Sequence, residues 1–229
     1  PDFTLPSDWR YQLALDYRFD IPTLGDDYLW TTEFLHIKRI DSAYWLDASL
    51  RESDIAGLAA DGRRILYNDD DSNFDILLTN TDDGGRSNIL STVLSKSFEN
   101  GWDFSASYTH QDITEAAPGT SSRAISNYLN TPSINPNVPD DSLGRGRFEL
   151  EHRFVLNVNY SAEIFAGYNT DFTLFFERKS GQPTSYLSYL DSSLARNTLT
   201  PGVTGGDFLP YIPTAGDPNV VYDGVTEAE

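Results

Sequence analysis

Residues 89–111 read ILSTVLSKSFENGWDFSASYTHQ, and this stretch predicts a β-hairpin. After the central Asn-Gly pair, apolar and polar side chains alternate from Trp102 to Gln111. A period of two is typical of a strand with one apolar and one polar face. Before the pair, two leucines and a phenylalanine occupy one face and serines occupy the other. Asn-Gly between two such runs is a strong hairpin signal.

The parity of the two faces decides how long the hairpin loop is. A two-residue loop would set Phe98 opposite Asp103, which places an apolar side chain against a polar one. A three-residue loop, Glu99–Gly101, makes the apolar faces coincide, with Gly101 in the left-handed position of a type I turn followed by a bulge. The pairs that this loop predicts are Phe98 with Trp102, Leu94 with Ala106, and Leu90 with His110.

The same alternation extends outward on both sides of the hairpin. It predicts four more long strands, Trp9–Asp20, Tyr28–Ile37, Phe148–Tyr160 and Thr170–Lys179, which makes six in all. The predicted short connections are Ile21–Asp27, Glu99–Gly101 and Ser161–Asn169, and the long ones are Asp41–Arg86, Ile113–Gly146 and the tail from Ser180. Asp41–Arg86 contains short strand pieces that could extend the long neighbours, at Ala43–Leu50, Arg64–Tyr67 and Phe74–Thr79.

Composition excludes several classes of function. The 229 residues include no Cys, which removes disulfides, thiolate metal sites and cysteine nucleophiles. A net charge of -19, concentrated in the long connections, argues against binding to nucleic acid. The chain has no Met and begins Pro-Asp-Phe, so we interpret it as a piece of a longer protein and infer nothing from the missing signal peptide.

Strand length favours a membrane barrel over a soluble sheet. Mean hydropathy is -0.42 and no run approaches the ~18 apolar residues of a membrane helix, but alternating strands escape hydropathy windows. A strand of 12 residues is about 40 Å long, or about 28 Å when tilted near 45°, close to an apolar band of about 25 Å. Strands of soluble proteins usually have about 5–6 residues.

Aromatic rings also collect near the predicted strand ends, where amphipathic rings favour the two membrane interfaces. They are Trp9, Tyr11, Tyr17, Phe19, Phe98, Trp102, Tyr108 and Tyr160. On the opposite parity, charged residues such as Glu149, Glu151 and Arg153 would line a wet lumen. The alternative interpretation of that parity is the solvent face of a soluble sheet.

Several segments, taken in order, resemble the Oar-like family of TonB-dependent outer-membrane transporters. They are Leu5–Arg10, Thr31–Leu35, Asp41–Tyr44, Leu77–Asp82 leading to Gly84 and Gly85, Leu94–Phe98 with Tyr108 and Thr109, Gly119–Ser122, Phe148 with His152 and Arg153, Ser180–Pro183, Tyr211–Pro213 and Asp217–Val220. The resemblance implies an all-β fold, an antiparallel transmembrane β-barrel of about 22 strands with long extracellular loops. Residues 1–229 would be a partial barrel domain that holds about six of those strands, with the plug and the remaining strands outside the chain.

The resemblance also implies a function. The chain would be part of an outer-membrane receptor for uptake of an unidentified nutrient or peptide, in contact with the lipid bilayer. A TonB-type energy-coupling protein would act through the plug, and no cofactor is expected. The alternatives are a soluble β-rich extracellular binding module, either an adhesin or a carbohydrate-binding domain, and an acidic β-sandwich hydrolase.

Candidate sites in the sequence are weak, and they assign no ligand-binding residue. Asp69–Asp75 spaces its oxygens as a Ca²⁺ loop does, but it lacks the Gly at position six, and Asn80 stands where position twelve needs Glu. Single histidines at His36, His110 and His152 show no zinc or triad spacing. Glu149 and Glu151, two apart as in a carboxylate pair, fit lumen charges better than a glycosidase site. No G-x-S-x-G elbow occurs, so we expect no catalytic residue, no metal site and no enzyme.

Overall fold

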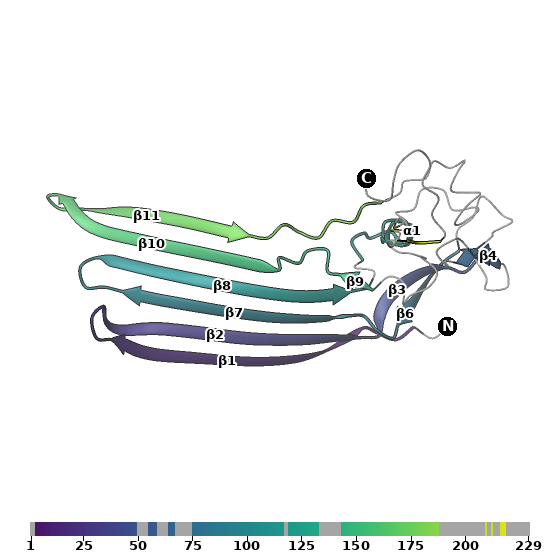
Figure 1. The fold of residues 1–229 in the computed structure, drawn as a ribbon, viewed down its shortest axis with the longest axis horizontal. Helices are drawn as coiled ribbons and strands as arrows, with labels where there is room; N and C mark the ends of the chain where they lie inside the picture. Colours follow the sequence, from purple (N-terminus) through teal and green to yellow (C-terminus); the bar gives the residue numbers. More distant parts are fainter. Residues whose placement is uncertain are drawn as a thin grey trace.

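The computed structural model describes residues 3–49, 55–58, 64–66, 75–116, 119–132, 143–187, 209, 212 and 216–218. Its main element is an antiparallel sheet in which the six long strands lie side by side in chain order (Figure 1). They are β1 (Ser7–Ile21), β2 (Gly25–Ile40), β7 (Arg86–Ser97), β8 (Trp102–Glu115), β10 (His152–Phe165) and β11 (Tyr168–Lys179). The prediction of six long strands is therefore confirmed.

The central hairpin has the predicted three-residue loop. Phe98 N–H donates to the Trp102 carbonyl oxygen at 2.7 Å, and Gly101 N–H donates to the Phe98 carbonyl oxygen at 3.3 Å. Gly101 has φ +86°, the left-handed conformation that glycine adopts without steric cost. The register pairs Leu94 with Ala106 and Leu90 with His110, as the parity argument requires.

The prediction for the last hairpin is wrong at both of its ends. The segment Ser161–Asn169, expected to be a connection, continues the two strands down to a two-residue turn at 166–167, where Gly167 has φ +83°. At the other end, β10 begins at His152 and not at Phe148. Residues 148–151 instead form a bend that lies beside the end of β8, where Gln111 N–H donates to the Glu151 carbonyl oxygen at 3.0 Å.

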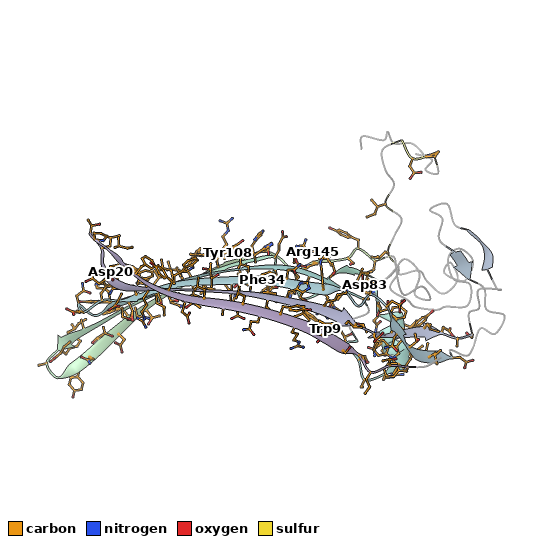
Figure 2. All side chains as sticks on the ribbon, turned by 90° about the horizontal axis from the view of Figure 1, so that it is seen from below. Trp9, Asp20, Phe34, Asp83, Tyr108 and Arg145 are labelled. Atoms are coloured by element: carbon orange, nitrogen blue, oxygen red, sulfur yellow. The ribbon has the colours of Figure 1, made fainter. Side chains whose placement is uncertain are left out.

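One end of the sheet carries short turns and the other carries long connections. The three short turns lie together at the left end of Figure 1, and both long internal connections leave from the right end. Asp20 marks the turn end and Asp83 the opposite end in the rotated view (Figure 2). This separation follows from the topology, because every antiparallel hairpin in the sheet is closed at the same end.

A small cap forms at the end opposite the turns, and we use this name for β3 (Ser42–Asp47), β6 (Ile76–Thr81) and α1 (Ala124–Leu129). β3 pairs with β6 in a sheet of their own, and α1 contacts both strands. The expectation that the segments Ala43–Leu50 and Phe74–Thr79 extend the long strands is wrong, because β3 and β6 form a separate sheet. Asp41, with φ +51°, turns the chain out of β2. Tyr44 and Tyr128 are buried in the cap.

Two shorter pairings complete the described structure. β4 (Ile55–Leu58) pairs with β5 (Arg64–Leu66), and β9 (Gly144–Arg145) pairs with the end of β8.

The long connection that contains the cap strands leaves and rejoins the sheet at one point, where Arg39 N–H donates to the Gly85 carbonyl oxygen at 3.0 Å. Glycine is required there, because a Cβ on Gly84 would collide with Ser42 and one on Gly85 with the Thr114 carbonyl.

The chain is all-β, with one short helix in the part that the structure describes. Among the described residues the main sheet is open, with β1 and β11 as its edges. Its long strands have 12 to 16 residues each. No described element forms a second layer over the sheet, and Figure 2 shows side chains leaving both of its faces along its length.

Candidate functional site: an aromatic sheet face and a charged rim

The register sorts the side chains of the sheet into two faces. Cross-strand partners share a face, and one such row runs Leu13, Phe34, Leu90, His110 and His152. We call this side the aromatic face; it carries the odd positions of β1 and the even positions of β2, β7, β8, β10 and β11. The other side is the polar face. The apolar and polar parities predicted for each strand therefore coincide across the whole sheet.

Large apolar side chains of the aromatic face are exposed over its entire width. Leu13 on β1 is 74% exposed, Phe34 on β2 is 43% exposed, and Leu174 on β11 is 61% exposed. Within the described part of the chain, the buried apolar side chains are Tyr28, Tyr44, Ala116 and Tyr128, and only Tyr28 belongs to the sheet. Monomeric soluble proteins rarely expose contiguous apolar patches beyond a few hundred Å². The aromatic face therefore needs an apolar partner.

Rings at the turn end of the aromatic face pack against one another. Phe19 stacks on Tyr28 at 5.6 Å between ring centroids, and Trp102 stacks on Tyr160 at 4.6 Å. Lys96 lies among them, with its Nζ 5.3 Å from the centroid of the Phe98 ring. A cation over a ring face is attracted by the ring quadrupole. Of the aromatic residues expected near strand ends, four therefore lie at the turn end as a packed cluster: Phe19, Phe98, Trp102 and Tyr160. The expectation is wrong for Tyr108, which lies in the middle of β8.

Charged residues are few on the aromatic face. Between the row of Leu13 and the rings at the turn end, the described strands carry two charged residues on this face, Lys96 at the margin on β7 and Arg178 on the edge strand β11, opposite Phe154. Beyond the row of Leu13, on the cap side, the face carries Lys38 on β2, Arg86 on β7 and Asp112 on β8. On β1, β2, β7, β8 and β10 the aromatic face therefore has an uncharged band with charged borders.

A shallow groove of about 440 Å³ lies within the uncharged band. Ala106 lines its floor, and its cross-strand neighbours Leu94 and Leu156 belong to the same row. The groove exists because alanine is the smallest side chain in a row of large ones. Its walls are aromatic and include Tyr17, Trp30, Tyr108 and Phe154.

Side chains of the polar face form hydrogen bonds between neighbouring strands. Gln12 Nε2 donates to Glu33 Oε1 at 2.9 Å, and Thr31 Oγ1 donates to Asp16 Oδ1 at 2.6 Å. At the β10–β11 edge, Arg153 Nε donates to Glu177 Oε1 at 2.8 Å. Arg153, predicted to be a charge of the polar parity, lies on that face as expected.

A charged rim lies where β8, β9 and β10 meet beside the cap, and its centre is Arg145 (Figure 2). The Arg145 Nη2 donates to Glu149 Oε1 at 2.9 Å and to Glu151 Oε2 at 2.5 Å. Glu149 is 2% exposed, and its second oxygen accepts from Ile113 N–H at 3.3 Å. Hydrogen bonds from Arg145 lower the pKa of Glu151, and the two carboxylates raise the pKa of Arg145. The interpretation of Glu149 and Glu151 as two charges on one strand face is wrong, because both precede β10 and bind one arginine.

The structure brings two of the three histidines together. His110 and His152 are direct cross-strand partners whose rings stack with centroids 5.0 Å apart. Tyr108 Oη lies 2.8 Å from His152 Nδ1, and His110 Nδ1 lies 3.0 Å from the Glu151 carbonyl oxygen. The interpretation of these histidines as scattered single residues is wrong for this pair. His36 lies apart from them, with its Nδ1 2.6 Å from Asn88 Oδ1.

The remaining sequence candidate is the acidic segment Asp69–Asp75. Within the described residues, no group of three or more potential ligands is placed to hold a metal ion. Residues 69–74 of the acidic Asp69–Asp75 segment lie outside the described residues. In the cap, burial raises the pKa of the Tyr128 phenol, and the nearby Asp47 carboxylate raises it further.

Comparisons of the chain with protein-family models, with curated proteins and with solved structures find no match. Among the described residues, no helix is long and apolar enough to cross a membrane.

Proposed function

We propose that this chain is part of the transmembrane barrel of a TonB-dependent receptor in the cell outer membrane. The observation that carries the proposal is the exposed aromatic face, which is continuous over six long strands and has a hydrogen-bonded polar face behind it. In this arrangement the aromatic face contacts lipid and the polar face lines the aqueous interior. The remaining strands, which close the barrel, pair with the edges at β1 and β11.

Strand dimensions support the proposal. β8 and β10 have 14 residues each, which corresponds to about 46 Å along the strand and about 33 Å along the membrane normal at a tilt near 45°. That length crosses an apolar band of about 25 Å and leaves a margin for both interfaces. The placement of Lys96 at one margin and of Lys38 and Arg86 at the other agrees with such a crossing.

The topology suggests which end faces the outside. In bacterial barrels the short turns are periplasmic and the long loops extracellular. We therefore propose that the three turns lie on the periplasmic side, and that the cap and the charged rim lie outside the cell. The nutrient ligand would meet the chain at that outer end. Uptake, and coupling to a TonB-type protein through a plug, rest on the family resemblance of the sequence alone.

Spin labels on neighbouring residues of β1 test the proposal. Leu13 and Ala14 are adjacent in the chain, and their side chains leave opposite faces near mid-strand. In outer-membrane vesicles that contain the complete protein, we expect a label at position 13 to be relaxed by oxygen. A label at position 14 should instead be relaxed by a water-soluble nickel complex.

Equal accessibility at positions 13 and 14 would contradict the proposal. So would a protein that stays monomeric in buffer without detergent and unfolds in one sharp thermal transition. Either result would favour the soluble extracellular binding module, in which the aromatic face packs against another protein layer.

A further inference from the structure

Two cations stand opposite each other at the cap-side margin of the aromatic face. Lys38 on β2 and Arg86 on β7 are direct cross-strand partners, and Trp9 on β1 is the next residue of the same row. Like charges directly opposite in an antiparallel pair destabilise it. An anion bound between the two side chains would remove that repulsion.

The protein itself neutralises this pair only in part. Asp112 Oδ2 lies 3.9 Å from Arg86 Nη2, and it also accepts a hydrogen bond from Asn88 Nδ2 at 3.2 Å. Both members of the ion pair are more than half exposed. In the described part of the chain Lys38 has no ion-pair partner, although it is exposed beside Arg86. A chain of net charge -19 therefore carries a local excess of positive charge on the face that we assign to lipid.

The distance from the cations to the groove matches the depth of one lipid leaflet. Thr92, which lines the groove, lies six residues from Arg86 along β7. Six residues span about 20 Å along a strand and about 14 Å along the normal at a tilt near 45°. That is roughly half of the ~30 Å hydrocarbon core. A lipid whose head group meets the cations therefore has its acyl chain at the level of the groove.

The path between the two parts is apolar for most of its length. Phe34 and Leu90, cross-strand partners midway, are both exposed on this face. A free phosphate ion would use the cations and leave the groove empty, whereas a neutral lipid would use the groove and leave the cations unmatched. One anionic lipid would pair with the cations through its head group and fill the groove with its acyl chain.

We propose that the aromatic face holds one anionic lipid with a phosphate head group at a defined site. Its phosphate is bound between Lys38 and Arg86, and an acyl chain lies in the groove over Ala106. The inference rests on the proposed membrane-barrel function, because the groove and the cations face lipid only in that setting.

Removal of the two cations tests the head-group half of the site. The complete protein is purified in detergent and titrated with phosphatidylglycerol, with phosphatidylcholine as the neutral lipid, and bound lipid is counted by native mass spectrometry. The double variant Lys38→Gln/Arg86→Gln should bind phosphatidylglycerol about thirtyfold more weakly, about fivefold for each cation lost near a membrane surface. Phosphatidylcholine carries the same phosphate beside a choline cation, so its binding should change much less.

Arg10→Gln is the matched control, because Arg10 lies at the same end of the sheet on the polar face, where it pairs with Asp8 at 2.9 Å. It should leave phosphatidylglycerol binding unchanged. An equal loss in Arg10→Gln and in the double variant would overturn the inference, because the effect would then be one of general charge. Displacement of the lipid by equimolar inorganic phosphate would overturn it as well, because the site would then be one for the free ion.

Filling the groove tests the acyl half. Ala106→Phe should weaken phosphatidylglycerol binding about tenfold, because the ring takes the place of one or two methylene groups of the chain. Ser105→Phe, on the polar face of the same strand, should leave binding unchanged.

The failure of this inference and that of the proposed function can be told apart. Lipid binding that is indifferent to Lys38, Arg86 and Ala106, in a protein that fractionates with the outer membrane, overturns the inference alone. A protein absent from the membrane fraction overturns both.

Discussion

The sheet and the cap differ in where their apolar side chains find partners. In the cap, Tyr44 and Tyr128 are almost completely buried between two short strands and a helix. In the sheet, side chains such as Leu13 and Leu174 are more than half exposed, although the strands are two to three times as long as those of the cap. The cap therefore makes its own small core. The sheet needs an apolar environment that the described chain does not supply, and the proposed contact with lipid would provide it.

The largest change should follow from opening the core of the cap. Tyr44→Ala removes a side chain that is 2% exposed and should destabilise the cap by about 3–5 kcal/mol, as for other large aromatic core residues. Hydrogen exchange of β6 and α1 measures this loss, and exchange in the sheet should not change. Tyr186→Ala, at a position that is 86% exposed, is the control and should have no effect. If the sheet loosened together with the cap, the two regions would not be independent.

The second prediction concerns the two faces of the sheet. Leu13→Arg should cost about 2–4 kcal/mol in a bilayer, because the proposed membrane assignment puts position 13 near the midplane on the lipid side. Ala14→Arg, one residue along and on the polar face, should cost much less. Equilibrium unfolding of the complete protein from lipid vesicles gives both values. Equal costs would mean that the sheet has no lipid side.

A smaller effect is expected from the turn of the central hairpin. Gly101→Ala places a Cβ at φ +86° and against the Ser161 carbonyl of the neighbouring strand, which should cost about 1–3 kcal/mol. Gly181→Ala is the matched control, because Gly181 has open space around the Cβ position and an ordinary φ. Protection of the Phe98 and Ser161 amides in hydrogen exchange reports the change. Full protection in the Gly101 variant would contradict it.

The smallest effect should be the pH response of the charged rim. Arg145 lowers the pKa of Glu151, so the stabilisation from their contact is complete above the ordinary glutamate value, about 4.5, and is lost as pH falls through the lowered pKa. We expect the bend at 148–151 to open in acid, seen as faster exchange of the Leu150 and Glu151 amides. Because Arg145 and Glu151 are both well exposed, solvent screens this contact and the change should be modest. Arg145→Gln should shift the transition toward pH 4.5, and an unshifted transition would contradict this assignment.

The local sequence pattern predicted the sheet, because the alternation of apolar and polar residues in each long strand shows which side chains share a face. Parity alone fixed the three-residue loop at Glu99–Gly101, since a one-residue slip moves every side chain to the other face. The turn of the last hairpin was misplaced because Ser161, Ala162 and Glu163 weaken the strand pattern, although Gly167 marks the true turn. The short helix α1 gave no signal, since six residues show no period, and its preceding Arg123 makes no capping hydrogen bond.

The pairs across long connections could not be found in the same way. His110 and His152 are 42 residues apart, and only the register between β8 and β10 makes them neighbours. That register depends on where β10 begins, and the pattern placed its start four residues too early. The binding of Glu149 and Glu151 to Arg145 depends on a bend and a two-residue strand, which hydrophobic periodicity does not report.

The point at which the cap-bearing connection leaves and rejoins the sheet bears on how such a protein can diversify. Because Lys38 and Arg86 are already neighbours in the ladder, the segment between them begins and ends at almost the same place, closed by the bond from Arg39 to Gly85. For a loop whose ends are held together, each doubling of its length costs only about 0.6 kcal/mol. Insertions, deletions and wholesale exchange of this segment should therefore leave the strands beneath it in place. This junction is also suited to loop grafting. A foreign epitope or binding loop inserted between Asp41 and Asp83 would be displayed on an unchanged sheet.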